Sequence, residues 1–86
     1  MRIRFSEHAW DDLLHWQRTD KKRFRRLTIL IRDVERDPFD GIEKPEPLKG
    51  DLSGFWSRRL DTEHRLIYRV QGDTLDIIQC HGHYGD

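Results

Sequence analysis

Two side chains suited to proton transfer stand out in this 86-residue chain. Glu46 lies between Pro45 and Pro47, whose rings stiffen the backbone, so its carboxylate suits a general base. His83 lies near the C-terminus and suits a general acid, because histidine ordinarily titrates near neutral pH. A carboxylate base and an imidazole acid together predict acid–base chemistry.

Cationic and aromatic side chains add a phosphate-binding character to this pair. Arg59 and Arg65 offer planar guanidinium forks for phosphate oxygens. Tyr84 offers a hydroxyl or a stacking face, which proteins commonly use for single-stranded RNA. Taken singly, each residue also has a plainer interpretation, since Glu46 alone would be a solvated loop charge. The two arginines alone would be surface residues paired with Asp61, Glu63 or Asp76.

The C-terminal stretch QCHGHYGD allows a third interpretation. On a strand, His81 and His83 would project to the same side, as two metal ligands do, whereas Cys80 would point the other way. A protein metal site needs three or four ligands, and no further cluster is visible in the sequence. The sequence therefore predicts neither a metal nor another cofactor.

Composition limits the kind of protein this chain forms. With 35% hydrophobic and 37% charged residues, residues 1–86 form a single domain with a thin, strictly patterned core. One cysteine excludes an internal disulfide and fits a reducing compartment. No apolar run has the length of a signal peptide or membrane span, so we expect a cytoplasmic protein without a membrane partner.

Charge is balanced overall but clustered locally. The chain has 16 basic and 16 acidic residues, so the net charge does not indicate a nucleic-acid partner. The stretch KKRFRR is nevertheless one basic block, which by itself is most simply a solvated helix face. Four of its residues are candidates for binding ribosomal RNA: Lys21, Lys22, Arg25 and Arg26.

The N-terminal half predicts a strand and two helices. RIRF alternates apolar and basic residues as a short strand does, and Ser6 follows as the N-cap of a helix to about Arg18. Thr19 or Asp20 caps a second helix, which must end before Pro38. The apolar stripe of this helix comprises Phe24, Leu27, Leu30, Ile31 and Val34.

The C-terminal half predicts a long functional loop and three strands. The loop from Pro38 to Gly54 holds all three prolines and half of the six glycines. Strands follow at about residues 55–60, 64–70 and 74–83. Together with the N-terminal half, these elements predict an α+β fold. Both helices would pack on one face of a mostly antiparallel sheet.

The register of these strands follows from placing the apolar side chains on one face. A register that places Trp56 opposite Tyr68 and Arg58 opposite Leu66 gathers the apolar residues of both strands on one face. Arg58 is the one charged residue on that face. The next turn then pairs Tyr68 with Ile77. The opposite face, which the helices leave open, carries Phe55, Arg59, Arg65, Ile67 and Arg69.

Two stretches of the sequence, KPEPLKGDLSGFWSRRLDTEHRLIYRV and HYGD, resemble the YoeB/Txe family of the RelE superfamily. The resemblance extends from SEHAWDDLLHWQ through DPFDGIEKPEPLKG to His83 and Tyr84. It departs at His81, where the family often has arginine, and at Gly85 and Asp86, which follow the usual His-Tyr end. The resemblance implies a RelE-like fold and a ribosome-dependent mRNA endoribonuclease from a toxin–antitoxin pair.

The resemblance also assigns roles to the candidate residues. It implies that Glu46 removes the proton of a 2′-hydroxyl, His83 protonates the 5′-oxygen leaving group, and Arg65 stabilises the charged phosphate between them. It gives supporting roles to Lys49, Arg59 and Tyr84. His64, in the stretch EHRL, is by its place in the chain more simply a structural residue of the hairpin than a catalyst.

Partners are likewise expected from the resemblance. They are the ribosome with its mRNA, and a cognate antitoxin of the YefM/Phd type with an acidic C-terminal tail. The toxin itself would form a homodimer or a toxin–antitoxin heterocomplex. The alternative is a RelE-like module that binds a ribosome or an antitoxin without cleaving RNA.

Overall fold

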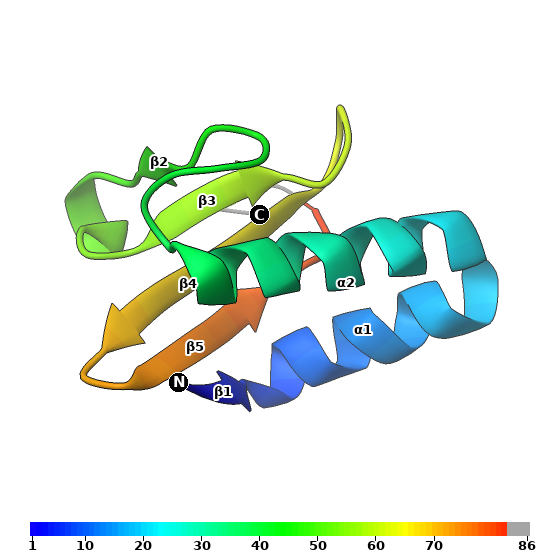
Figure 1. Ribbon diagram of the computed structural model, residues 1–86. Helices are drawn as coiled ribbons and strands as arrows, with labels where there is room; N and C mark the ends of the chain where they lie inside the picture. Colours follow the sequence, from blue (N-terminus) through cyan, green and yellow to red (C-terminus); the bar gives the residue numbers. More distant parts are fainter. Residues whose placement is uncertain (83–86) are drawn as a thin grey trace.

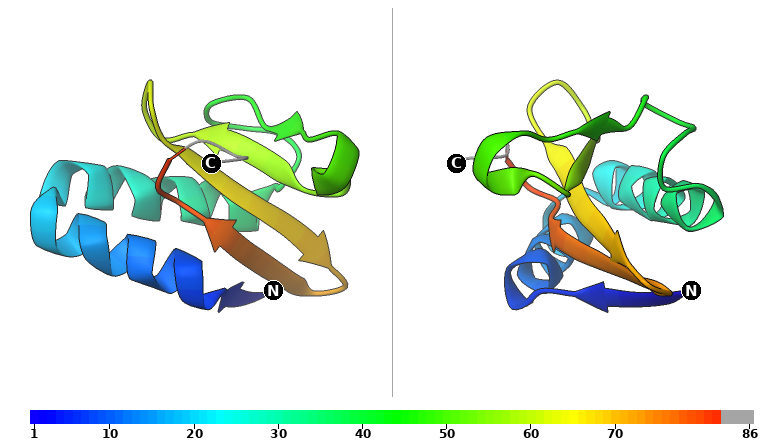
Figure 2. Two further views of the ribbon diagram at one scale, coloured as in Figure 1. Left: turned by 180° about the vertical axis from the view of Figure 1, so that it is seen from behind. Right: turned by 90° about the vertical axis from the view of Figure 1, so that its left-hand side faces the viewer.

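The computed structural model describes residues 1–82 and has an α+β fold, which confirms the predicted fold class. His83 and Tyr84 lie outside the described residues. Two helices run across one face of a five-stranded sheet, in front of it in Figure 1 and behind it in the left view of Figure 2.

Both helices begin where the sequence places an N-cap. Helix α1 spans Glu7–Thr19, and the Ser6 hydroxyl accepts a hydrogen bond of 3.0 Å from the Ala9 amide. Helix α2 spans Lys21–Arg36 and is capped by Asp20 rather than Thr19. It ends two residues before a proline, as predicted.

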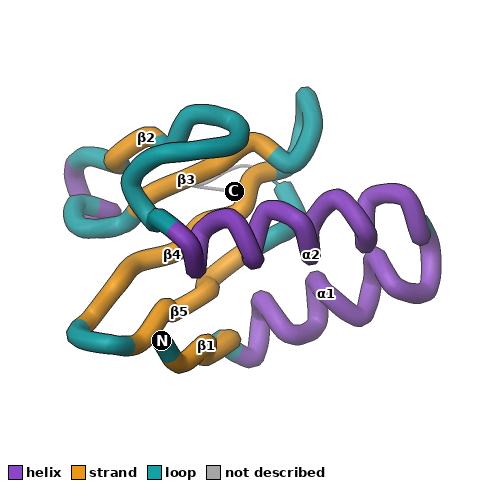
Figure 3. Tube along the Cα trace, viewed as in Figure 1, coloured by secondary structure: helices purple, strands orange, loops and turns teal. Residues whose placement is uncertain are grey.

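The sheet has the strand order β1-β5-β4-β3-β2, and only β1 and β5 run parallel. Its strands are β1 (Arg2–Phe5), β2 (Glu46–Pro47), β3 (Trp56–Arg59), β4 (Arg65–Gln71) and β5 (Thr74–Gln79). Strand β2 lies inside the segment that the sequence marks as loop, and a 3₁₀ turn, η1 (Gly50–Leu52), follows it. Figure 3 shows the remaining loop between α2 and β2 in teal.

The predicted register is confirmed. Trp56 pairs with Tyr68 and Arg58 with Leu66 across β3 and β4, and Tyr68 pairs with Ile77 across β4 and β5. This places the apolar sides of the strands under the helices, where the core forms. The core comprises Ala9, Trp16, Leu27, Leu30, Ile31, Val34, Leu60, Leu66, Tyr68, Leu75, Ile77 and Cys80.

Strand β5 is shorter than the sequence predicts, because it ends at Gln79 rather than at position 83. The Cys80 amide donates a 3.0 Å hydrogen bond to the Asp12 carboxylate, and the Cys80 carbonyl accepts one of 2.8 Å from Trp16 Nε1. Both groups therefore bond to α1. Gly82 then adopts a φ of 87°, which an L-residue rarely adopts. The expectation that His81 continues the strand is therefore wrong.

Candidate active site

A groove of about 420 Å³ opens on the sheet face opposite the helices. It contains three of the side chains that the sequence selects, Glu46, Arg59 and Arg65. Gly41, Glu43 and Lys44, from the loop before β2, complete its lining. Glu46 thus shares one charged groove with two arginines that lie 13 and 19 positions after it in the sequence.

Glu46 reaches this groove because β2 pairs with β3. It lies opposite Ser57, and residues directly opposite each other on paired strands point to the same face. Arg59, two residues after Ser57, shares that face, as does its partner Arg65 on β4. Proline cannot donate to a ladder and is tolerated at an edge, so Pro47 fits this edge strand. The Glu46 side chain is exposed and therefore accessible to a substrate.

Arg59 and Arg65 lie directly opposite each other, an arrangement in which like charges repel. Within residues 1–82, neither guanidinium has a carboxylate as an ion-pair partner. Arg65 makes one long hydrogen bond, of 3.5 Å, to the Ser57 hydroxyl. Two facing cations without acidic partners are suited to binding an anion.

The plainer interpretation paired Arg59 and Arg65 with Asp61, Glu63 or Asp76, but two of these three carboxylates pair with other arginines. Asp76 pairs with Arg4 at 2.6 Å and with Arg69 at 3.2 Å, and these partners lower the pKa of its carboxyl group. Asp61 pairs with Arg23 of α2. The two groove arginines are therefore not part of the surface ion pairs that organise this side of the sheet.

A buried arginine anchors the loop that forms one wall of the groove. Arg58 is fully buried and donates to the Asp33 carboxylate and to the carbonyls of Asp37 (2.6 Å), Ile42 (3.1 Å) and Asp40 (3.3 Å). Beside it, the Tyr68 hydroxyl donates to the Pro38 carbonyl at 2.6 Å. These bonds hold the loop in place from the face of the sheet that the helices cover.

The same loop packs closely enough to require glycine at position 41. A Cβ there would come within 2.2 Å of an Asp33 carboxylate oxygen, and the backbone has a φ of 135°. Asp33 also accepts a 2.9 Å hydrogen bond from the Ile42 amide. Glu43 follows with a φ of 59° and pairs with Arg26 of α2 at 2.6 Å. The loop is thus held from α2 as well as from β3.

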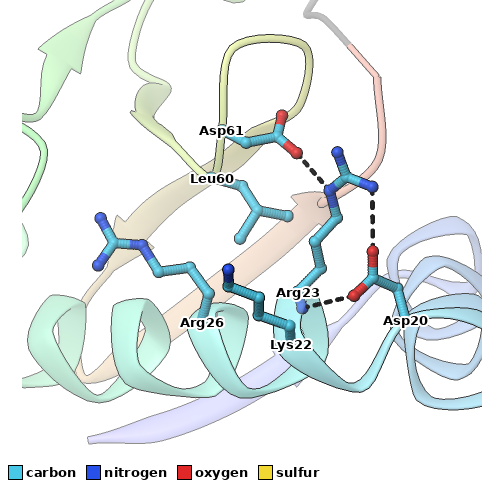
Figure 4. A pocket seen from close by; sticks show the side chains of 6 residues that line it. All are labelled: Asp20, Lys22, Arg23, Arg26, Leu60 and Asp61. Atoms are coloured by element: carbon cyan, nitrogen blue, oxygen red, sulfur yellow. Dashed lines mark hydrogen bonds and ion pairs between the residues drawn. The ribbon is translucent and has the colours of Figure 1, made fainter.

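The basic block on α2 divides into paired and solvent-exposed side chains. Arg23 bridges Asp20 and Asp61, as Figure 4 shows for the pocket beside Leu60. Arg26 pairs with Glu43 of the groove loop at 2.6 Å, although 38% of its side chain is exposed. The remaining cations are exposed: Lys21, Lys22 and Arg25.

The C-terminal segment returns to β4 next to Arg65. The Arg65 amide donates to the Gly82 carbonyl at 2.9 Å, and the Gly82 amide donates to Nδ1 of His64 at 2.8 Å. His81 packs instead on the rings of Trp16, His15 and His64, with centroids 4.7–5.0 Å away. Among residues 1–82 there is no group of three or more His, Cys, Asp or Glu side chains able to hold a metal ion.

Comparison with known proteins identifies the family. The sequence profile of the YoeB-like toxins of bacterial type II toxin–antitoxin systems matches residues 5–84. The chain belongs to this family. It is 55% identical to the toxin YoeB of Streptomyces coelicolor over 84 residues, which is 98% of this chain and all of that one. This confirms the predicted family membership.

Solved structures of YoeB proteins share the fold. A YoeB/ParE toxin from Agrobacterium tumefaciens superposes with a TM-score of 0.95, 49% identity and coverage of 98% of this chain and 100% of that chain. YoeB from Staphylococcus aureus, in a YoeB–YefM complex and as a dimer, gives TM-scores of 0.89 and 0.90 at 38% and 39% identity. Coverage is 98% of each chain in both comparisons. The chain is therefore the toxin of a type II toxin–antitoxin system with a RelE-like fold.

The YoeB-like groove brings together only part of the predicted residue set. Glu46, Arg59 and Arg65 line it, whereas Lys49 is exposed at the start of η1 and is not part of the lining. The sequence analysis missed the anchoring role of Arg58, although its position among apolar neighbours signalled a buried charge in need of a partner. No helix within residues 1–82 is long and apolar enough to cross a membrane.

Proposed function

We propose that this YoeB-like toxin is a ribosome-dependent mRNA endoribonuclease that cuts the codon in the ribosomal A site and so stops translation. The observation that carries the proposal is the groove in which the Glu46 carboxylate shares one sheet face with two arginines that have no carboxylate partner within residues 1–82. A base and a pair of phosphate-binding cations are two of the three components that metal-independent RNA cleavage requires. The toxin would act in the cytoplasm, where ribosomes translate.

In the proposed reaction, Glu46 removes the proton from a ribose 2′-hydroxyl. The 2′-oxygen then attacks the adjacent phosphorus, and Arg65, supported by Arg59 and Lys49, stabilises the extra negative charge that develops on the phosphate oxygens. His83 donates a proton to the departing 5′-oxygen. The bond from phosphorus to that oxygen breaks, which leaves a 2′,3′-cyclic phosphate or its 3′-phosphate hydrolysis product, and a 5′-hydroxyl. Tyr84 would stack on a neighbouring base.

An antitoxin of the YefM type is the proposed inhibitor. The S. aureus relative occurs in a complex with YefM, and the groove of this chain presents two arginines to which no acidic side chain of the described residues is paired. A segment that supplies carboxylates to Arg59 and Arg65 would neutralise both and cover the groove. We expect this segment to be an acidic tail that is disordered alone and ordered on the toxin. The complex would contain one or two toxin chains.

Substitution of the proposed base and acid tests the function. Glu46→Ala and His83→Ala should each lower the cleavage rate on programmed ribosomes by about 10²–10⁴-fold, because each removes one proton-transfer step. Primer extension on a translated message measures the cuts, which should be in phase with the codons. Glu63→Ala is the matched control, since Glu63 is exposed and lies outside the groove. Unchanged cleavage by the double variant would contradict both roles and favour a non-catalytic binding module.

A further inference from the structure

A second basic cluster lies on the sheet face that carries the groove, toward the β1 edge. Arg4 of β1 and Arg69 of β4 both bond to the Asp76 carboxylate on β5, the strand between them. Leu66, Tyr68 and Val70 of β4 pack in or against the core, so the residues that alternate with them face the open side. This open side faces the reader in the left view of Figure 2.

The cluster keeps a positive charge, because two guanidinium groups share one carboxylate. Arg4 donates to Asp76 from two nitrogens, at 2.6 and 3.1 Å, so this pair alone is bidentate. Arg69 uses only its Nε for Asp76, at 3.2 Å, which leaves its two terminal nitrogens for a further acceptor. The Arg4 side chain is 65% exposed and that of Arg69 36%. Both cations are therefore accessible to an anion.

The guanidinium of Arg69 also lies over an aromatic ring. Its central carbon is 5.0 Å from the centroid of Phe55, which directly precedes β3 and is only half-buried. The bond to Asp76 holds one edge of the guanidinium while the ring lies against it. RNA bases stack on aromatic rings and on arginine planes, so this pair is a platform for a base.

The space beside the cluster is small. Six residues line a hollow of about 160 Å³: Arg4, Phe5, Ser6, Arg69, Asp76 and Ile78. Pockets for whole small-molecule ligands measure about 300–1,000 Å³. This hollow therefore suits one part of a larger ligand, such as a single base or phosphate.

The cluster and the groove lie on the path of one strand. Arg65 and Arg69 are four residues apart on β4, which corresponds to about 13 Å along the strand. Stacked nucleotides follow one another at about 3.4 Å along one nucleic-acid strand, so about four of them cover this distance, and fewer do if the RNA is extended. An RNA strand that reaches Arg65 in the groove can therefore also reach Arg69.

We propose that Arg69 and Phe55 form a second RNA subsite, which stacks a base of the mRNA a few nucleotides away from the phosphate that is cut. Arg4 lies beside it for the adjoining phosphate, and Asp76 orients both arginines. This inference rests on the proposed nuclease function, because it requires the mRNA to lie in the groove. An acidic peptide is the less suitable occupant, since Asp76 repels its carboxylates and it gains nothing from a stacking platform.

Binding of RNA that cannot be cut tests the subsite without any cleavage. The probes are a trinucleotide, which fills only the groove, and an octanucleotide, both single-stranded and 2′-O-methylated so that no 2′-hydroxyl can attack. Arg69→Lys keeps the charge and its bond to Asp76 but loses the planar fork. By fluorescence anisotropy, it should weaken octanucleotide binding about tenfold, because loss of one stacked base costs about that factor. Trinucleotide binding should not change.

Two further variants separate stacking from charge. Phe55→Leu removes the ring but no charge, and it should weaken octanucleotide binding as Arg69→Lys does. Arg32→Lys is the matched control, since Arg32 is an exposed arginine paired with Glu35 on α2, on the opposite side of the sheet. It should bind both probes as the unaltered toxin does, and thermal unfolding checks that every variant is folded. Equal octanucleotide binding by Arg69→Lys, Arg32→Lys and the unaltered toxin would overturn the proposal.

An octanucleotide with one abasic position identifies the stacked base. At one position outside the groove, removal of the base should weaken binding to the unaltered toxin about tenfold and binding to Arg69→Lys hardly at all, because that contact is already lost. Equal losses in both proteins at every position would refute stacking on Arg69. A peptide rich in Asp and Glu serves as the competing ligand. If Arg69→Lys weakens binding of the peptide but not of the octanucleotide, the surface takes an acidic protein segment and the proposal fails.

Kinetics on programmed ribosomes distinguishes the subsite from the proposed function. Arg69→Lys should raise KM about tenfold and leave the rate at saturating ribosome unchanged, because the platform lies away from the reacting atoms. If the unaltered toxin cuts no RNA but binds the octanucleotide through Arg69, the proposed function fails and the subsite stands. If the toxin cuts RNA and Arg69→Lys changes neither KM nor octanucleotide binding, the function stands and the subsite is refuted.

Discussion

Arg58 is the side chain whose removal should cost this fold most. Its guanidinium is fully buried and binds one carboxylate and three loop carbonyls. Arg58→Met fills much the same volume but leaves the Asp33 carboxylate, whose side chain is 12% exposed, without its buried partner. Breaking a buried ion pair from one side costs about 3–5 kcal/mol. The whole domain is expected to be stable by about 4–13 kcal/mol, so this loss is a large fraction of the total.

Chemical and thermal unfolding would measure this loss. At about 4–8 °C per kcal/mol for a domain of this size, Tm should fall by about 12 °C or more. Arg59→Met is the matched control, because Arg59 is the same residue type one position later but faces the groove and is exposed. Its effect should remain within about 0.5 kcal/mol. Equal effects of the two substitutions would refute the argument that the buried guanidinium stabilises the loop.

The stability of the protein at acid pH should depend on the same ion pair between Arg58 and Asp33. Hydrogen bonds from Arg36, Arg58 and the Ile42 amide lower the pKa of Asp33 below its ordinary value. An Asp carboxyl titrates near pH 3.9 in the unfolded chain, so this stabilisation is complete above about pH 4 and is lost as pH falls toward the lower folded pKa. The free energy of unfolding should therefore fall less steeply below pH 4 in Arg58→Met than in the unaltered protein.

Two further predictions concern the α2 face and the core thiol. Replacing Lys21, Lys22 and Arg25 together with glutamine should weaken ribosome binding and reduce its salt slope by about two to three units, while single-turnover cleavage at saturating ribosome stays unchanged. A lost rate at saturation would mean that these cations act in the chemical step. Cys80 is fully buried, and this burial raises the pKa of its thiol. The nearby Asp12 carboxylate is a second, smaller cause of the same rise. Iodoacetamide should therefore label Cys80 at pH 8 only as fast as the protein unfolds, and labelling at the rate of an exposed thiol would contradict this burial.

Sequence patterns predicted the parts of this fold that depend on local periodicity. The faces of β3 and β4 follow from a repeat of two, because a slip of one residue would place Tyr68 and Leu66 in solvent. The cap of α1 follows in the same way from the residue type of Ser6. Such patterns require no knowledge of distant contacts.

The parts that the sequence did not predict depend on contacts between distant segments. Strand β2 exists because Glu46 and Pro47 meet β3, nine residues or more further along the chain. Strand β5 ends early because Cys80 bonds to α1, more than sixty positions away. The hydrogen bond from the Gly82 amide to Nδ1 of His64 depends likewise on the return of Gly82 to β4. A two-residue strand and a side-chain anchor have too few residues to produce a periodic signal.

The adjacent arginines of β3 connect the stability of the toxin to its proposed inhibition. Successive side chains of a strand point to opposite faces, so Arg58 enters the core and organises the loop, while Arg59 enters the groove that this loop borders. The first arginine is neutralised by Asp33 within the fold, but the second faces Arg65 and has no carboxylate partner within residues 1–82. An anion that binds both groove arginines relieves their repulsion. On the proposed function, an RNA phosphate and an antitoxin carboxylate compete for this same relief, so antitoxin binding and RNA binding exclude each other at these two side chains.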